Sequence, residues 1–183
     1  MDSEHLHEFT GVREAACEGL RSGAFVPDAG SPVCRFVILP SFGNSVAWEV
    51  RSRPVRARPA ELRLFHSCWR MDLDLQHFGS PLERLKHPRP YRPTVEVGSV
   101  LVDADRINAL VHRFGCTPIP LGVAVPPVGC DGTIYELDIG NFFCHARIAW
   151  WVSLPLEWKA LEPIIEDKVA LFELAWQTTN PAP

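Results

Sequence analysis

The sequence predicts an α+β fold in which helices pack on one face of a mainly antiparallel sheet. Two alternating segments around Gly140–Asn141 have the pattern of a β-hairpin, and the last part of the chain carries an apolar stripe of helical period. Hydrophobic residues make up 46% of the 183-residue chain and charged residues 22%, as in a globular protein of ordinary domain size. We therefore expect a single domain over residues 1–183.

The first part of the chain is expected to form one short helix and three strands. The helix is predicted from Phe9 to Arg21, followed by a loop rich in Pro, Gly, Asp and Ser from Val26 to Pro32. A β-branched, apolar run predicts a strand from Val33 to Leu39. Alternating apolar and polar residues predict further strands from Ser45 to Arg53 and from Glu61 to Ser67.

The middle of the chain is expected to contain a loop, a strand and a helix. A proline-rich loop with at most one helical turn is predicted from Gly79 to Pro93, and a fourth strand from Thr94 to Val102. Asp103 is a good N-cap for the helix that follows, and Gly115 is expected to end it at the C′ position. The apolar residues of this helix recur with helical spacing at Ile107, Leu110, Val111 and Phe114.

The hairpin near the C-terminus is the clearest pattern in the chain. Strands are expected from Thr133 to Ile139 and from Phe142 to Val152, with Gly140–Asn141 as a two-residue turn. This register pairs Leu137 with Cys144 and makes one face of the hairpin nearly all apolar. Because side chains alternate along a strand, the other residues form a second, polar and aromatic face.

That second face is the predicted binding surface. The register places Glu136 opposite His145, and Glu49 and Arg51 would join them if the first hairpin belongs to the same sheet. Aromatic residues and arginine are enriched at protein interfaces, so we predict that this face binds another protein. The alternative is that a further layer covers it, for instance the segment from Gly115 to Cys130. The candidate binding residues are Phe143, His145, Arg147, Trp151, Glu136 and Asp138.

A last helical region is expected to begin at Ser153 and Pro155. Its predicted buried stripe consists of Trp158, Leu161, Ile165, Val169, Phe172 and Trp176. Pro163 lies inside this region, and because proline cannot donate a backbone hydrogen bond, it should kink or restart the helix there.

Three segments resemble a group of known proteins. They are the run from Asp131 to Leu137 with its hairpin, the helix start Pro155-Leu156-Glu157-Trp158, and the run from Arg35 to Phe42. Together they resemble small uncharacterised bacterial proteins with a D-G-T-x-Y/W-x-L hairpin followed by a C-terminal helix. Proteins of this general shape include immunity proteins, so the resemblance implies an inhibitor that neutralises a bacterial toxin. It implies no catalytic residues.

The charge is unevenly distributed along the chain. The formal net charge is −4, too small to imply a polyanionic or polycationic partner. Residues 51–92 hold ten Arg or Lys against four acids, a local +6, whereas residues 131–183 hold three against eight, a local −5. The N-terminus is acidic without an apolar segment, and no run reaches the roughly 18 apolar residues of a membrane span. We expect a cytoplasmic protein without a membrane partner.

Nucleic-acid binding is an alternative that we do not expect. Arginines with tryptophans nearby can contact phosphates and stack on bases. The overall isoelectric point of about 6.0 and the prolines among these arginines instead favour an ordinary solvated loop. The residues concerned are Arg51, Arg53, Arg56, Arg58, Trp48 and Trp69.

Neither a metal site nor another cofactor is expected. His66-Ser67-Cys68 and Cys144-His145 offer nitrogen and sulfur ligands, but structural zinc sites use paired ligands at each end of a loop. Neighbours such as Cys144 and His145 also point to opposite faces of a strand. The six cysteines lack any C-x-x-C pair, and a chain of this size needs no disulfide, so we predict reduced and mostly buried thiols.

The sequence does not predict an enzyme. No nucleophile elbow, dinucleotide-binding fingerprint or phosphate-binding loop occurs. The alternative function is a small enzyme or ligand-binding domain that uses Glu136, Asp138, His145 and Arg147 as a polar cluster. A deep polar pocket around these four residues would favour that alternative, and a flat aromatic face would favour the protein-binding domain.

Overall fold

The computed structural model describes residues 3–27, 30–56, 60–80, 91–120, 131–140 and 145–179. The helices are α1 (Ser3–Ser22), α2 (Met71–Gly79), α4 (Ala104–Cys116), α5 (Glu162–Thr179) and the short 3₁₀ helix η1 (Leu156–Leu161). The strands are β1 (Ser31–Pro40), β2 (Ser45–Arg53), β3 (Glu61–Trp69), β4 (Val95–Leu101), β5 (Thr133–Gly140) and β6 (His145–Trp151). No helix within the described segments is long and apolar enough to cross a membrane.

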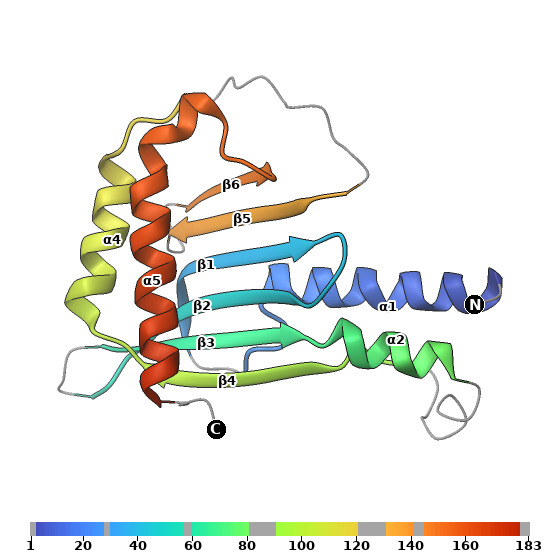
Figure 1. Ribbon diagram of the computed structural model, residues 1–183. Helices are drawn as coiled ribbons and strands as arrows, with labels where there is room; N and C mark the ends of the chain where they lie inside the picture. Colours follow the sequence, from blue (N-terminus) through green and yellow to red (C-terminus); the bar gives the residue numbers. More distant parts are fainter. Residues whose placement is uncertain are drawn as a thin grey trace.

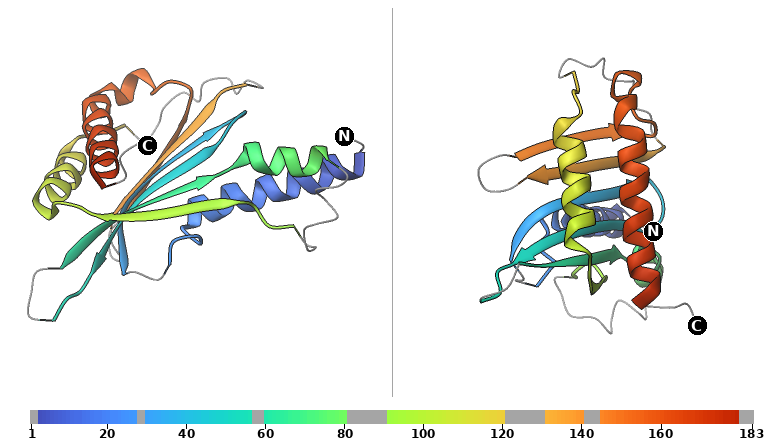
Figure 2. Two further views of the ribbon diagram at one scale, coloured as in Figure 1. Left: turned by 60° about the horizontal axis from the view of Figure 1, so that its bottom comes forward. Right: turned by 90° about the vertical axis from the view of Figure 1, so that its left-hand side faces the viewer.

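The strands form one antiparallel sheet in the order β4-β3-β2-β1-β5-β6 (Figure 1). The predicted α+β fold is therefore confirmed. Helices α4 and α5 cover one face, as Figure 2 shows. The larger core lies between these helices and the sheet, and its most deeply buried residues include Val50, Leu64, Ile107, Leu161 and Phe172.

The expectation of helices on one face only is wrong, because α1 and α2 pack on the opposite face (Figure 2). In α1 the apolar residues follow helical spacing and form one stripe: Phe9, Val12, Ala16 and Leu20. On the sheet, Val37 and Leu39 point toward α1, since they alternate with Phe36, which faces α5. The central strands are thus apolar on both faces, and each face needs its own helical layer.

Several predicted boundaries agree with the structure. Strand β2 spans Ser45–Arg53 as predicted, and the Asp103 side chain accepts hydrogen bonds from the backbone N–H groups of Asp105 and Arg106 at 2.9 and 3.1 Å. The region around Pro163 also agrees, because η1 ends at Leu161 and α5 begins at Glu162. Proline is tolerated here because the N–H group that it lacks would have no acceptor within the first turn of the helix.

Two details of the predicted helices are wrong. Gly115 does not end its helix: α4 continues to Cys116, where the Thr117 hydroxyl donates to the Arg113 carbonyl at 2.8 Å. Helix α2 was not predicted at all. It contains the fully buried Asp74, which accepts a hydrogen bond from Trp69 Nε1 at 2.7 Å. The proline-rich loop predicted from Gly79 to Pro93 lies largely outside the described residues.

The predicted register of the last hairpin is also wrong. Leu137 pairs with Ile148 rather than with Cys144, and His145 pairs with Gly140, which places four residues, 141–144, between the strands. The shift brings Trp150 beside Tyr135, with ring centroids 5.5 Å apart. Because the shift along β6 is four positions, an even number, every described side chain keeps its predicted face.

Candidate functional site

The face of β5 and β6 that carries the predicted binding residues lies beside helix α1. Since α1 packs on β1 and β2, it leaves a groove of about 810 Å³ between its side and the β5–β6 edge of the sheet. We call this space the α1–β6 groove. Its lining residues are Thr10, Arg13, Glu14, Cys17, Glu18, Arg21, Leu39, Pro40, Ser41, Ile134, Ala149, Trp150 and Trp151.

Glu136 joins helix and sheet next to this groove. Its side chain is buried, and its Oε1 accepts a hydrogen bond from Arg21 Nε of α1 at 2.6 Å. Its Oε2 accepts a second one from Arg147 on β6. This hydrogen bond raises the pKa of Arg147 further above its ordinary value. Of the Arg147 side chain, 47% is exposed.

His145 and Asp138 form a second polar contact on the same face. Their Nε2 and Oδ1 atoms are 2.6 Å apart, and 56% of the His145 side chain is exposed. The predicted pairing of Glu136 with His145 is therefore wrong. In the actual register Glu136 lies opposite Ala149 and Asp138 opposite Arg147, so both contacts run diagonally between the strands.

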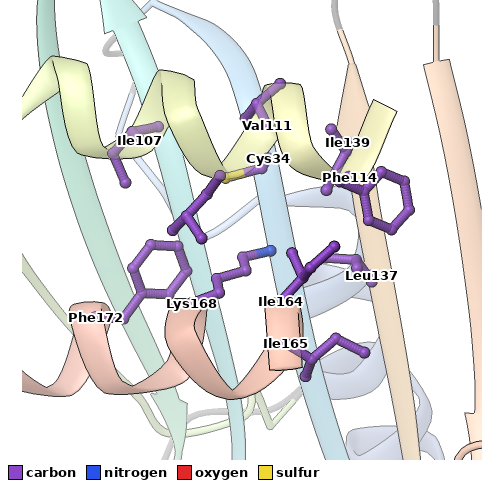
Figure 3. Close-up of a pocket in the computed structure, with 11 residues that line it drawn as sticks. Cys34, Ile107, Val111, Phe114, Leu137, Ile139, Ile164, Ile165, Lys168 and Phe172 are labelled. Atoms are coloured by element: carbon purple, nitrogen blue, oxygen red, sulfur yellow. The ribbon is translucent and has the colours of Figure 1, made fainter. Parts of the chain in front are cut away.

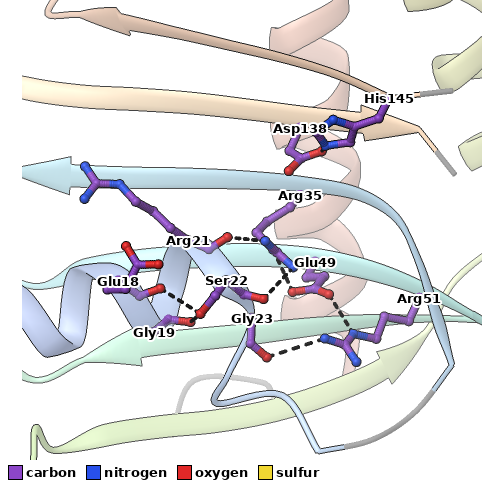
Figure 4. Close-up of polar contacts among 10 residues, drawn as sticks. All are labelled: Glu18, Gly19, Arg21, Ser22, Gly23, Arg35, Glu49, Arg51, Asp138 and His145. Carbon is purple, nitrogen blue, oxygen red and sulfur yellow. Dashed lines mark hydrogen bonds and ion pairs between the residues drawn. The ribbon is translucent and has the colours of Figure 1, made fainter. Parts of the chain in front are cut away.

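The C-terminus of α1 rests on charged side chains of β1 and β2 (Figure 4). Glu49 is buried and accepts hydrogen bonds from Arg35 Nε at 2.8 Å and from Arg51 Nε at 2.6 Å. The same arginines donate to backbone carbonyls at the helix end, Arg35 to Ser22 at 3.2 Å and Arg51 to Gly23 at 3.4 Å. Cations are favourable at this end because the last carbonyls carry partial negative charge.

Glu49 and Arg51 do share a face with the hairpin residues, as the sequence suggested. They lie beneath the end of α1 and hold the helix in place, so they are not free to contact a partner. Gly23 allows this close approach, with a φ of 72°. A Cβ atom on Gly23 would lie 2.5 Å from Glu49 Oε2 and 2.6 Å from Arg35 Nη2. Both the positive φ and these close side chains favour glycine at this position.

Trp151 lies where β6 meets the groove. Its ring is half-buried and lies so close to Gly132 that a Cβ there would overlap the indole nitrogen. Gly132 is held in turn by Ser41, whose N–H donates to the Gly132 carbonyl at 2.7 Å. Trp151 is therefore a supported aromatic group in the groove wall. The remaining predicted residue, Phe143, lies outside the described residues.

Sequence reasoning missed the groove wall that α1 provides. Arg13, Cys17 and Arg21 recur every four residues, as do Glu14 and Glu18, so these side chains form one face of a helix. That spacing could have indicated a charged face beside the apolar stripe. No local sequence pattern could have indicated that this face of α1 would lie next to β6.

The features considered for nucleic-acid binding do not form one surface. Trp48 and Trp69 are only 7% and 1% exposed and belong to the two cores, so neither can stack on a base. Arg51 is paired with Glu49. Arg53 and Arg56 are exposed, and Arg58 lies outside the described residues.

The cysteines of the described segments are free thiols, but their burial varies. Cys34 is buried, Cys17 and Cys68 are half-buried, and Cys116 is exposed, whereas Cys130 and Cys144 lie outside those segments. The same part of the chain contains no group of three or more His, Cys, Asp or Glu side chains that could hold a metal ion. Burial raises the pKa of the thiols of Cys34, Cys17 and Cys68, which keeps them protonated.

The polar cluster considered for catalysis is divided into two polar contacts. Both carboxylate oxygens of Glu136 accept hydrogen bonds from guanidinium groups, which hold the side chain in place between α1 and β6. His145 and Asp138 are more accessible, and an aspartate that orients a histidine is a common arrangement in general bases.

Comparison of the chain with protein-family models, with curated proteins and with solved structures finds no match. Function is therefore inferred from the geometry and chemistry of the groove.

Proposed function

We propose that the protein binds another protein through the α1–β6 groove. The observation that supports this most is the mixed chemistry of the groove: Ile134 and Trp151 provide apolar contact area, and charged side chains of α1 lie along the opposite wall. An apolar centre with a charged margin is the usual arrangement of protein interfaces. Tryptophan and arginine are also the side chains that most often dominate binding energy.

The groove favours a partner segment that carries a carboxylate next to an apolar side chain. The exposed part of Arg147 faces the solvent on the same side of the sheet, and its guanidinium has five donors, of which Glu136 uses only part. In the version of this proposal that the sequence resemblance suggests, the partner is a bacterial toxin. The protein is then a cytoplasmic immunity-type inhibitor that blocks the toxin by occupying one of its surfaces.

Site-specific photo-crosslinking in the native cell tests the proposal. A photoreactive amino acid replaces either Ala149, which lines the groove, or Ala109, an exposed residue of α4 on the opposite side. We expect one stoichiometric protein adduct from position 149 and none from position 109. Equal adducts from both positions, or none from either, would contradict the proposal.

The purified partner then allows a quantitative test. Trp151→Ala should weaken binding by about thirtyfold or more, as expected for loss of an aromatic hot spot. The matched control is Leu156→Ala, which removes an 80% exposed leucine outside the groove. Unchanged binding by the Trp151 variant would place the interface elsewhere.

The second candidate, a small enzyme or ligand-binding domain, is favoured by the exposed His145–Asp138 pair. A thermal-shift screen with small molecules tests it. A ligand that stabilises the protein and the His112→Ala variant, but not the His145→Ala variant, would support this candidate, since His112 is an exposed histidine of α4.

A further inference from the structure

Lys168 of α5 has a buried amine in the core on the opposite side of the sheet from the groove. The residue is 4% exposed, and its Nζ has no hydrogen-bond partner within the part of the chain that the structure describes. Buried lysines are rare, and those without an acceptor are rarer, because desolvation of an ammonium group is costly. The position of Lys168 thus needs an explanation beyond packing.

The amine points into a small cavity between α4, α5 and the sheet (Figure 3). Apart from Lys168 and the Cys34 thiol, every lining residue is aliphatic or aromatic: Ile107, Leu110, Val111, Phe114, Leu137, Ile139, Ile164, Ile165 and Phe172. The cavity has a volume of about 10 Å³, which is room for about one group of the size of a water molecule. Leu110, Val111 and Ile165 are only partly buried, so this wall of the cavity lies near the molecular surface.

The surroundings favour the neutral amine. Burial lowers the pKa of Lys168 below its ordinary value, and only Cys34 and Asp138 oppose this effect. Burial also raises the pKa of the Cys34 thiol, so Cys34 supplies no negative charge. Asp138 lies on the other face of the sheet, paired with His145. The rings of Phe36 and Phe172, with centroids 5.5 and 5.4 Å from Nζ, attract an ammonium group less strongly than water does.

We propose that Lys168 is a covalent binding site for small aliphatic aldehydes. A neutral amine in an apolar pocket is a good nucleophile toward a carbonyl carbon. Nζ forms a bond to that carbon, and the carbonyl oxygen leaves as water with the two hydrogens of the amine, so an imine results without an oxidant or reductant. The cavity limits the ligand to a short alkyl group, and its lining provides no second polar contact.

The experiment uses reductive trapping on the full chain, which contains only three lysines, Lys86, Lys159 and Lys168. Acetaldehyde is added with cyanoborohydride, which reduces an imine to a stable secondary amine, and peptide mapping by mass spectrometry locates the ethyl group. The mapping also separates the lysines from the N-terminal amine. We expect Lys168 to react at least about tenfold faster near pH 7 than the exposed Lys159, because burial lowers the pKa of Lys168.

The pH profile provides a second signature. Between about pH 7 and pH 9 the labelling rate of Lys168 should rise less steeply with pH than that of Lys159, because burial lowers the pKa of Lys168. Labelling of Lys168 no faster than that of Lys159, or only after denaturation, would overturn the proposal.

Lys168→Met provides the matched variant, because methionine fills similar space without an amine. Acetaldehyde should raise the melting temperature of the wild-type protein but not of this variant. Ethanol, which can enter the cavity without forming an imine, should raise neither. Equal effects of acetaldehyde and ethanol would mean that the cavity takes up small molecules without reaction at Lys168, which also contradicts the proposal.

Discussion

Arg21 of α1 and Glu136 of β5 form an ion pair with 2.6 Å between Nε and Oε1, and it joins residues 115 positions apart in the chain. This contact and the neighbouring one between Arg147 and Glu136 link the helix to β5 and β6 beside the groove. The carboxylate is buried, whereas both guanidinium groups reach the solvent. The same ion pairs therefore stabilise the fold and orient the cations that a partner would meet.

Glu136→Gln tests the structural role of this carboxylate. The amide keeps the shape of the side chain but removes the negative charge between two arginines, so we expect a loss of about 1–3 kcal/mol in the free energy of unfolding. Partial exposure of both arginines keeps the loss below that of a fully buried pair. Urea unfolding measures it.

The matched control is Glu61→Gln, which removes the negative charge from a half-buried pair with Arg63 at 3.3 Å. It should cost at most about 0.5 kcal/mol. Equal losses for the two variants would show that Glu136 has no special role in stability.

Gly23→Ala should be destabilising. The new Cβ would meet Glu49 and Arg35, and alanine is strained at a φ of 72°, so we expect a loss of about 1–3 kcal/mol. Gly11→Ala, inside α1, is the control, because a Cβ there meets nothing within 4 Å. It should stabilise α1 by up to about 1 kcal/mol. Thermal melts that shift in the same direction for both variants would refute this explanation.

Phe172→Ala should be among the most destabilising changes in the core. The side chain is fully buried and packs near Trp48, so we expect a loss of about 3–5 kcal/mol in the free energy of unfolding. Leu174→Ala, at a 53% exposed position of the same helix, should cost less than about 0.5 kcal/mol. A loss below about 1 kcal/mol for the phenylalanine variant would mean that α5 does not bury this stripe.

Trp158 belongs to the same sequence pattern but lies in a different environment. It is only half-buried, and its Nε1 donates to the Pro120 carbonyl at 3.0 Å. The sequence places Trp158 and Phe172 on one stripe and predicts equal burial for them. The structure corrects this for Trp158, so its truncation should cost less than that of Phe172.

His66 should make stability depend on pH. Burial lowers the pKa of this histidine, which lies between the rings of Trp48 and Trp176 at centroid distances of 4.2 and 4.8 Å. The unfolded chain then binds a proton more readily than the folded protein does. The free energy of unfolding should therefore fall as the pH drops below about 6.5, the ordinary value for histidine, and level off below the lowered pKa.

Denaturant unfolding between about pH 5 and pH 8 measures this effect in the wild-type protein and in His66→Phe. The variant keeps an aromatic ring between the two tryptophans but has no group that titrates there. The free energy of unfolding of the variant should decrease less than that of the wild-type protein as the pH falls over this range. Parallel curves for the two proteins would assign the pH dependence to other groups.

The sequence alone determined several local features of this protein. The Asp103 cap, the restart of the helix after Pro163 and the bounds of β2 follow from residues within a few positions of one another. Alternation along each strand also assigned the described hairpin residues to their faces correctly, because a side chain's face depends only on whether its position is odd or even. Lys168 is four residues from both Ile164 and Phe172, so these three side chains share one face of α5, although the predicted stripe included neither Lys168 nor Ile164.

The tertiary structure decided how these elements meet. A turn of two residues and a connection of four are both compatible with the local pattern around Gly140, and the packing of Trp150 against Tyr135 and Phe36 selects the second. Similarly, the apolar stripe of α1 does not specify which surface it covers. Its position depends on Arg21, Arg35 and Glu136, whose ion pairs and hydrogen bonds join residues far apart in the chain. The groove exists because such long-range contacts, which no local sequence pattern encodes, hold the helix beside β5 and β6.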